Sequence, residues 1–373
     1  MKYVERLRRL LPLRYDLHFN RGPYVHNRSR DRRLTARFLL DGSLEYEISL
    51  GYKEWGRPYK AYLAPWRVEI LDESGNLVER HDFDLTGKSV RVNIDSRSLG
   101  DTLAWLPQVA RFAAQYPHTK VYCSHFWPSL GMNDKYPELH FIDPDVELEN
   151  CYATWEIGFY LDERMLQKHP VDPRSAPMAQ IASDILAIPY EETRPRLNQD
   201  HTDRPLANPY VCIATHSTAG CKLWQYPDGW QRVIDFLASR GFDVVLIQKE
   251  PGDYSGIINK TGDLPIQDRI RDLHHCEFFI GLGSGLSWLA WAVNKPVIMI
   301  NGFSEPFTEF QKDCIRVSNN SVCTGCWNDP TYTFEAGDWN WCPRHRDDGR
   351  RFECSTEITP EIVIKAVDRV MAN

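Results

Sequence analysis

The pattern of hydrophobic and polar positions changes at about residue 88. Before that point, apolar and polar residues alternate in short runs, over 44–50, 66–72 and 77–83, with turn residues between them. Alternation with period two, broken by frequent turns, is typical of antiparallel strands. We therefore predict a small antiparallel β domain over residues 1–88.

From residue 89 onward, hydrophobic runs alternate with helical patterns. Residues 89–95 (SVRVNID) predict a strand, and apolar positions at helical spacing predict a helix over 103–116. Further strands are expected at 121–124, 139–142 and 153–160, and a helix at 177–186. This βαβ order predicts a Rossmann-like domain over residues 89–205, which ends in a Pro-rich, charged linker.

The same alternation begins again after the linker. Strands are predicted at 210–215, 242–248, 278–280 and 297–300, and helices at 230–239, 286–293 and 360–371. Short, unbroken apolar runs on either side of helices indicate buried parallel strands. The sequence thus predicts a second Rossmann-like domain over residues 206–373, facing the first across a cleft.

Composition and charge exclude several classes of protein. The chain has 373 residues, of which 42% are hydrophobic and 25% charged, and a net charge of -7, which argues against a general nucleic-acid binder. Its apolar runs are shorter than the roughly 18 residues of a membrane helix, and its start lacks a secretory signal pattern. We expect a cytoplasmic protein without membrane insertion. Ten of the first 33 residues are Lys or Arg, which most simply form a solvated face.

Three loops carry candidate chemistry at the carboxyl edges of the predicted sheets. The Gly-rich turn 281–285 opens a helix, where free N–H groups favour a phosphate, although a tight crossover turn that needs glycine would look the same. Lys222 follows the first strand of the second domain, where it could neutralise a diphosphate or simply be solvated. Asp101 follows the strand at 89–95, where it could act as a general base or cap the next helix.

Four of the ten cysteines lie within 32 residues. Cys323 and Cys326 have two residues between them, and Cys342 and Cys354 follow in a segment rich in Trp, Asp and Gly. Four thiolates at such spacing match a closed tetrahedral site for zinc or iron, and the alternative is four unrelated thiols. We predict a metal-binding finger over residues 323–354, with a structural role.

Three motifs, in this order and spacing, resemble those of the ADP-heptose:lipopolysaccharide heptosyltransferases. Gly100-Asp101-x-Leu103-x-x-Leu106-Pro107 resembles their Gly-Asp-x-Leu-x-x-Leu-Pro, Lys222-x-Trp224 their Lys-x-Trp, and Gly285-Leu286-Ser287-Trp288-Leu289 their Gly-Leu-Ser-His-Leu. The appended β domain and the four cysteines depart from those enzymes. Both features match the bacterial autotransporter heptosyltransferases, to which the chain is therefore more similar. A third departure is Gly283-Ser284, where the lipopolysaccharide enzymes usually have Asp-Thr or Asp-Ser.

The resemblance implies an α/β protein of the GT-B type and an inverting protein O-glycosyltransferase. It would transfer heptose from ADP-heptose to Ser hydroxyls of autotransporter adhesins, with Asp101 as the base and no catalytic metal. It also implies structural iron at Cys323, Cys326, Cys342 and Cys354, with zinc as the alternative, and a large ring-like homo-oligomer, a dodecamer being one expected form. The expected nucleotide-sugar-binding residues are Thr102, Leu103, Thr218, Lys222, Gln248, Gly283, Ser284, Gly285, Leu286 and Ser287.

Two other functions are weighed against this one. A lipopolysaccharide-core heptosyltransferase would share the three motifs but would have no evident use for the β domain or the finger. A non-catalytic binding module, with the finger as a zinc ribbon, would need neither Asp101 nor Lys222. The sequence does not identify the group that reads the sugar in place of a carboxylate at Gly283.

Overall fold

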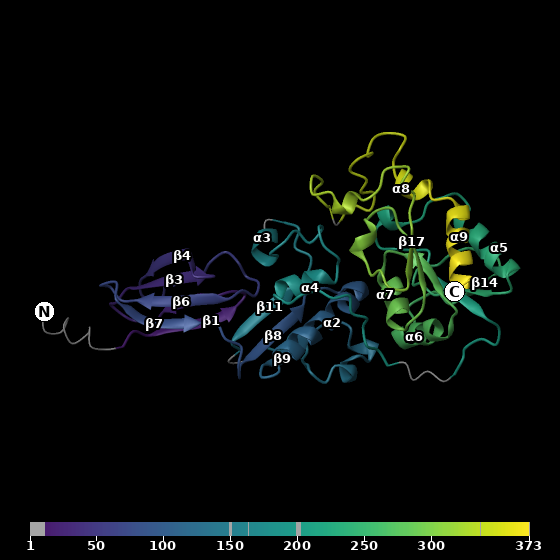
Figure 1. Cartoon of the computed structure of the whole chain (residues 1–373). Helices are drawn as coiled ribbons and strands as arrows, with labels where there is room; N and C mark the ends of the chain where they lie inside the picture. Colours follow the sequence, from purple (N-terminus) through teal and green to yellow (C-terminus); the bar gives the residue numbers. More distant parts are fainter. Residues whose placement is uncertain (1–11, 149–150, 163, 199–202, 336, 373) are drawn as a thin grey trace, which may run out of the picture.

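The computed structural model describes residues 12–148, 151–162, 164–198, 203–335 and 337–372. Part of the Lys- and Arg-rich start, residues 1–11, lies outside this range. The strands form a four-stranded, a seven-stranded and a six-stranded sheet, arranged along the long axis of the molecule in Figure 1. No helix among the described residues has the length and apolar character needed to cross a bilayer.

The four-stranded sheet is antiparallel, as the alternating pattern predicts. Its order is β4-β3-β6-β7, with β3 at Leu34–Leu40, β4 at Ser43–Leu50, β6 at Trp66–Leu71 and β7 at Leu77–Asp82. Phe38 pairs with Val68, and the side chains of both are fully buried on the inner face. The three strand predictions in this region are confirmed.

The seven-stranded sheet recruits strands from both sides of residue 88. Its order is β10-β9-β8-β11-β1-β2-β5. The strands are β1 (Tyr15–Asn20), β2 (Tyr24–Asn27), β5 (Trp55–Gly56), β8 (Ser89–Ile94), β9 (Lys120–Ser124), β10 (His140–Phe141) and β11 (Ala153–Ile157). β1 pairs in parallel with β11, so three strands from the first 88 residues extend the Rossmann-like sheet. The division into domains at residues 88 and 205 stays a prediction.

Three helices accompany this sheet. α2 spans Leu99–Gln115, α3 Met165–Lys168 and α4 Gln180–Ile185. α2 begins four residues earlier than its apolar pattern predicts, because Leu99 and Gly100 already belong to its first turn. α3 was not predicted, since its four residues are too few to show a period.

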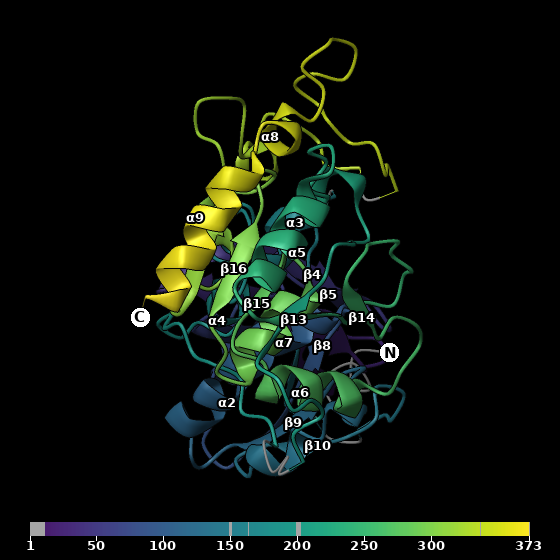
Figure 2. The ribbon, with the colours of Figure 1, turned by 90° about the vertical axis from the view of Figure 1, so that its right-hand side faces the viewer.

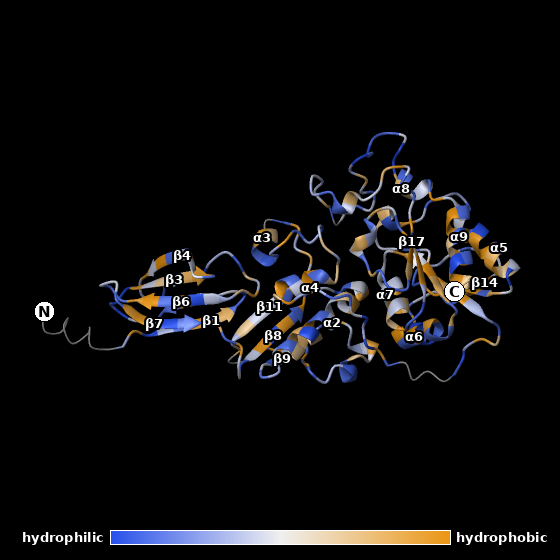
Figure 3. Cartoon of the chain, in the orientation of Figure 1, coloured by the Kyte–Doolittle hydropathy of each residue, from blue (hydrophilic) through white to orange (hydrophobic). Residues whose placement is uncertain are grey.

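The six-stranded sheet is entirely parallel. Its order is β14-β13-β12-β15-β16-β17, with strands Ile257–Asn259, Asp243–Leu246, Tyr210–Ile213, Phe279–Leu282, Val297–Ile300 and Cys314–Val317. α5 (Gly229–Ser239) packs with α9 (Pro360–Met371), and α6 (Ile266–His275) packs with α7 (Gly285–Ala292), as Figure 2 shows. In Figure 3 the strands of this sheet are predominantly hydrophobic, whereas the helices alternate between hydrophobic and hydrophilic residues.

Helices α2 and α7 join the two α/β units. A methyl group on Gly100 would lie 3.4 Å from Cα of Gly285, and one on Gly285 would lie 3.0 Å from Cβ of Leu99. Glycine at both positions therefore lets the two helix starts approach each other closely. Buried Trp105 and Trp291 belong to one continuous core that runs through this junction.

The segment 323–354 has little regular structure. It contains the short helix η5 (Cys326–Asn328) and the first residues of α8 (Glu353–Thr356), and forms the loops at the top of Figure 1. Its Trp327 and Trp341 pack with Phe303 and Cys221 in a small separate core. The finger is thus attached to the six-stranded unit beside the loop that carries Lys222.

Candidate active site

Asp101 lies in the first turn of α2 and lines a cavity of about 590 Å³. The helix starts after Ser98, and Asp101 makes no capping hydrogen bond, so the capping alternative is wrong. Instead its carboxylate accepts a hydrogen bond of 2.6 Å from the hydroxyl of Ser96. The side chain is therefore held at the carboxyl end of β8, with its carboxylate at the cavity.

Burial raises the pKa of Asp101 above that of an ordinary carboxyl group. The hydroxyls of Ser96 and Ser98 and the positive charge of Lys222 oppose this shift. A carboxylate whose pKa is raised is a stronger base than an exposed one. Asp101 thus has the environment of a general base.

Lys222 lines the same cavity as Asp101, from the other α/β unit. It ends the short helix η3 (Gly220–Lys222), which follows β12. Its ammonium group lies 5.9 Å from the ring centre of Phe303, so the side chain is directed toward the cavity wall. The structure brings together a carboxylate and a cation that the sequence places more than a hundred residues apart.

A second cavity, of about 690 Å³, adjoins the first. Ser98 and Lys222 line both, so the two cavities meet at these side chains. Of the predicted binding residues, the second cavity is lined by Thr218, Lys222, Gln248, Ser284, Gly285 and Leu286. It also contains Glu250, which sequence reasoning missed, and whose carboxylate pairs with His216 at 3.2 Å.

The side chain of Gln248 forms hydrogen bonds with two of the loops that line this cavity. Its side-chain oxygen accepts hydrogen bonds from the backbone N–H of Thr215 and His216, at 2.5 and 2.9 Å. Its amide group donates to the backbone oxygen of Glu250 at 3.0 Å. Gln248 thus connects the loop after β12 to the loop after β13, and most of its hydrogen-bonding capacity is used within the protein.

Three predicted binding residues have fully buried side chains: Thr102, Leu103 and Ser287. The hydroxyl of Thr102 donates to the backbone oxygen of Ser98 at 3.4 Å, and that of Ser287 to Leu282 at 2.6 Å. These side chains stabilise the starts of α2 and α7. The three residues are fully buried in this structure, and the backbone N–H groups of Thr102 and Ser287 donate to Ser98 and Ser284, so the structure does not expose them to a ligand.

The glycines of the turn 281–285 are required because a side chain at these positions would collide with neighbouring atoms. None of Gly281, Gly283 and Gly285 has a left-handed φ, so the turn does not need glycine for its backbone angles. A methyl group on Gly283 would lie 2.4 Å from Nδ2 of Asn301 and 2.8 Å from Oε1 of Glu309. A side chain at position 283 would therefore have to displace the side-chain ends of Asn301 and Glu309.

Glu309 is a second carboxylate in the cavity of Asp101, and sequence reasoning missed it. It pairs with Arg316 and lies 3.4 Å from the hydroxyl of Ser304 and from Nδ2 of Asn301. Only 8% of Glu309 is exposed, so its orientation is fixed. No local sequence motif marks Glu309.

We expect Gly283→Ala to displace Glu309 and Asn301, because the added methyl group has no room. Overpacking of this kind costs about 1–3 kcal/mol of the free energy of unfolding. Chemical denaturation would measure this loss, and Gly349→Ala is the matched control, since a methyl group there would contact nothing within 4 Å. Equal stability of the two variants would show that the site is less tightly packed than we describe.

The finger forms one wall of the cavity that Asp101 lines. Trp327, Thr333 and Phe334 line this cavity, and Phe159 from the other α/β unit lies against Trp327 at 5.6 Å between ring centres. Trp339 stacks on His216. A methyl group on Gly220 would lie 2.3 Å from the backbone oxygen of Trp339, so the finger packs closely against the loop that carries Lys222. The finger thus shapes the site, a role that its sequence did not indicate.

The four predicted metal-binding cysteines lie near one another. Burial and the charges of the other three and of Cys221 raise the pKa of Cys354 to about 12. A different trio, Cys323, His345 and Glu353, has ligand atoms that all lie within 4.8 Å of one another. His345 and Glu353 are further candidate ligands that the cysteine spacing could not reveal.

Comparisons with known proteins agree with this architecture. The model of glycosyltransferase family 9 (heptosyltransferase) matches residues 178–333. The autotransporter heptosyltransferase Aah of Escherichia coli is 36% identical over 82% of this chain and 80% of its own length. A protein described as the inactive autotransporter heptosyltransferase BimC, of Burkholderia thailandensis, is 32% identical over 83% of this chain and 74% of its own length.

The similarity extends to a solved structure. The crystal structure of TibC, described as a bacterial iron-containing dodecameric glycosyltransferase from enterotoxigenic E. coli H10407, matches with a TM-score of 0.89 and 32% identity. The match covers 96% of both chains. A second TibC structure, in complex with ADP-D-β-D-heptose, matches with a TM-score of 0.89 and 31% identity.

Proposed function

Since the chain belongs to the autotransporter heptosyltransferases, we propose that it transfers heptose from ADP-heptose to Ser hydroxyls of autotransporter adhesins. The observation that carries this proposal is the meeting of two cavities at Lys222, with Asp101 in one and the start of α7 in the other. One relative is described as inactive. The proposed activity of this chain therefore depends on its own Asp101 and Lys222.

The donor is proposed to bind in the larger cavity, with its diphosphate between Lys222 and the start of α7. The first N–H groups of a helix have no partner within that helix, and its dipole favours an anion. Glu250 is placed to accept hydrogen bonds from hydroxyl groups of the nucleotide, because its carboxylate lines this cavity. The sugar then extends past Ser98 into the cavity of Asp101.

Asp101 is proposed to remove the proton from the acceptor hydroxyl as the Ser oxygen attacks the anomeric carbon. The new C–O bond forms while the bond from this carbon to the phosphate oxygen breaks, and ADP leaves with the electron pair. Lys222 and the start of α7 stabilise the negative charge that develops on ADP. In other transferases a catalytic metal stabilises this charge. A single displacement of this kind inverts the configuration of the sugar.

Glu309 is proposed to bind hydroxyl groups of the heptose. Its carboxylate lines the cavity of Asp101 and is fixed by Arg316, as a group that reads a sugar must be. The ion pairs of Glu309 with Arg316 and of Asp162 with Arg164 make both carboxylates poor nucleophiles, which leaves Asp101 as the carboxylate that acts on the acceptor. Glu309 would thus supply the carboxylate that position 283 does not carry.

The finger is proposed to hold iron through Cys323, Cys326, Cys342 and Cys354, with zinc as the alternative metal. Soft thiolate donors suit both metals, and the iron-containing TibC supports iron. Cys323 also belongs to the trio with His345 and Glu353, so a mixed ligand set is the competing arrangement. In either case the metal would fix loops that have little regular structure.

Cys342→Ser is expected to lower the metal content and to disturb acceptor binding more than nucleotide binding, because the finger lines the cavity of Asp101. Elemental analysis per subunit, with ADP binding by calorimetry, would measure both effects. His345→Gln tests the mixed ligand set in the same assay, and Cys314→Ser, in β17, is the control. Metal content that is unchanged in Cys342→Ser but lost in His345→Gln would replace the four-thiolate site with the mixed one.

A large homo-oligomer and a cytoplasmic location complete the proposal. The dodecameric TibC supports the oligomer, and the need for a nucleotide sugar supports the cytoplasm, where such donors are made. A lipopolysaccharide-core transferase and a zinc-ribbon module are the remaining alternatives. The β domain and the finger disfavour the first, and the meeting of Asp101 with Lys222 disfavours the second.

The test of the proposed function is incubation of the protein with ADP-heptose and a Ser-rich fragment of an autotransporter adhesin. Release of ADP, with an added heptose mass on the fragment, is the expected result. Transfer only to lipopolysaccharide core would favour the first alternative. Binding of zinc without affinity for ADP-heptose would favour the second.

A further inference from the structure

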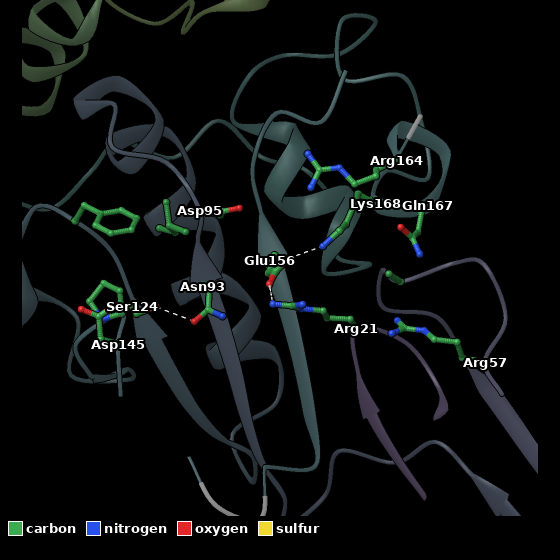
Figure 4. A pocket seen from close by; sticks show the side chains of 14 residues that line it. Arg21, Arg57, Asn93, Asp95, Ser124, Asp145, Glu156, Arg164, Gln167 and Lys168 are labelled. Atoms are coloured by element: carbon green, nitrogen blue, oxygen red, sulfur yellow. Dashed lines mark hydrogen bonds and ion pairs between the residues drawn. The ribbon is translucent and has the colours of Figure 1, made fainter. Parts of the chain in front are cut away.

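A third cavity, of about 610 Å³, lies at the carboxyl ends of β8, β9 and β11 (Figure 4). β8 lies between β9 and β11 in the sheet, so the strands that follow β8 in the chain are placed on opposite sides of it, which makes this a topological switch point. Crevices at such switch points are preferred ligand sites in α/β folds. Among the described residues, none of those that line this cavity lines either cavity of the candidate active site.

One short segment, residues 159–161, connects this cavity to the one that Asp101 lines. Asp95 lines the third cavity and accepts a hydrogen bond of 2.8 Å from the hydroxyl of Tyr160. The neighbours of Tyr160 in the chain, Phe159 and Leu161, line the cavity of Asp101. A polypeptide that crosses residues 159–161 would therefore reach both cavities.

The third cavity carries an excess of positive charge at one end. Its lining contains the cations Arg21, Arg57, Arg164 and Lys168 and the acids Asp95, Asp145 and Glu156. Glu156 is shared by Arg21 and Lys168, and Arg164 pairs with Asp162 outside the lining. Two cations thus compete for one carboxylate at the centre of Figure 4.

Arg57 is the cation whose charge the described part of the chain leaves unbalanced. No described residue forms an ion pair with it, and its Nε is buried with no described hydrogen-bond partner. In Figure 4 its guanidinium group points toward Arg21. Burial, and then the charge of Arg21, lower the pKa of Arg57. An anion beside Arg57 would offset the repulsion from Arg21 and give the buried charge a partner.

We propose that this cavity binds an Asp or Glu side chain of the acceptor polypeptide, with Arg57 as the group that receives the carboxylate. The inference rests on the proposed function, since it presumes a protein acceptor. A guanidinium group binds a carboxylate through two parallel hydrogen bonds. The cavity therefore selects acceptors that carry an acidic residue near the modified Ser.

The other end of the cavity supports a carboxylate on a peptide over a free phosphate. Asp95 and Asp145 lie there, together with Ser124 and Asn93. A doubly charged phosphate would be repelled by these two carboxylates. An Asp or Glu side chain of a peptide brings only one negative charge. The backbone N–H groups of the peptide can donate hydrogen bonds to Asp95 and Asp145.

The experiment compares two labelled versions of one Ser-containing adhesin fragment, the natural acidic one and one with every Asp and Glu changed to Asn and Gln. The wild-type protein should have a KM for the acidic fragment that is about tenfold lower. Arg57→Gln should remove this difference, with KM for ADP-heptose unchanged, and Arg57→Lys should restore part of it. Arg80→Gln, an exposed Arg of β7 beside Asp82, is the matched control.

Equal KM values for the two fragments with the wild-type protein would overturn the inference and leave the proposed function intact. Equal losses on both fragments in Arg57→Gln, or a change in its oligomeric mass, would also overturn it. Fluorescence anisotropy measures fragment binding without transfer. Binding of the acidic fragment that depends on Arg57, with no transfer of heptose, would retain the inference and refute the proposed function.

Discussion

Asp101→Asn is expected to lower kcat for heptose transfer by about 10²- to 10⁴-fold, the usual contribution of a general base. Asparagine has nearly the same shape and can still accept the hydrogen bond from Ser96, so the start of α2 should be preserved. The substitution also removes a buried charge. We therefore expect the free energy of unfolding to change by less than about 1 kcal/mol.

The control for this variant is Asp184→Asn, in α4. Burial raises the pKa of Asp184 as it does that of Asp101, but Asp184 lines neither active-site cavity. Its kcat should match that of the wild-type protein. Transfer that persists in Asp101→Asn at the wild-type rate would show that another group removes the proton.

The pH dependence of the wild-type protein should report the same group. Because the pKa of Asp101 is raised above 3.8, the acid limb of kcat/KM should lie at a higher pH than an ordinary Asp would give. Activity is lost as pH falls through this pKa, since the protonated carboxyl group cannot accept the proton of Ser. Asp101→Asn should abolish this limb along with the rate.

Lys222→Gln is the variant with the second largest expected effect, a fall in kcat of about 10²- to 10³-fold. Removal of one preorganised positive group that stabilises developing charge typically has this cost. The substitution also removes a charge that lowers the pKa of Asp101, so the acid limb should move to higher pH in the activity that remains. Steady-state kinetics over a range of pH would measure both changes.

Lys120→Gln, at the start of β9, is the control for the loss of one lysine charge. It lies outside both active-site cavities and should leave kcat unchanged. If Lys222→Gln changed KM for ADP-heptose without a change in kcat, Lys222 would bind the ground state and the transition state equally.

Most of the strands and helices follow from local patterns. The buried run Val297–Ile300 and the amphipathic helix α9 lie where periodicity predicts them. The polar helix α6 was missed, because its ten residues include only three large apolar side chains. Strand β5, with two residues, is too short to show any alternation.

The site was predictable only where a motif marks it. Asp101 and Lys222 lie in helical turns soon after strands, which is why the sequence pointed to them. Glu250 pairs with His216, which is far away in the chain, and nothing local distinguishes Glu250, Glu309 or Arg57 from other charged residues. The reason for glycine at position 283 likewise depends on Asn301 and Glu309, whose positions only the folded chain reveals.

The configuration of the transferred sugar tests the account most directly. Three carboxylates line the cavity, and we assign the acceptor proton to Asp101, because Glu309 pairs with Arg316 and Asp162 pairs with Arg164. With ADP-D-β-D-heptose as donor, NMR of the glycosylated adhesin fragment should show an α-linked heptose, which is the product of a single displacement. A β-linked heptose would require two displacements through a covalent intermediate and would contradict the account.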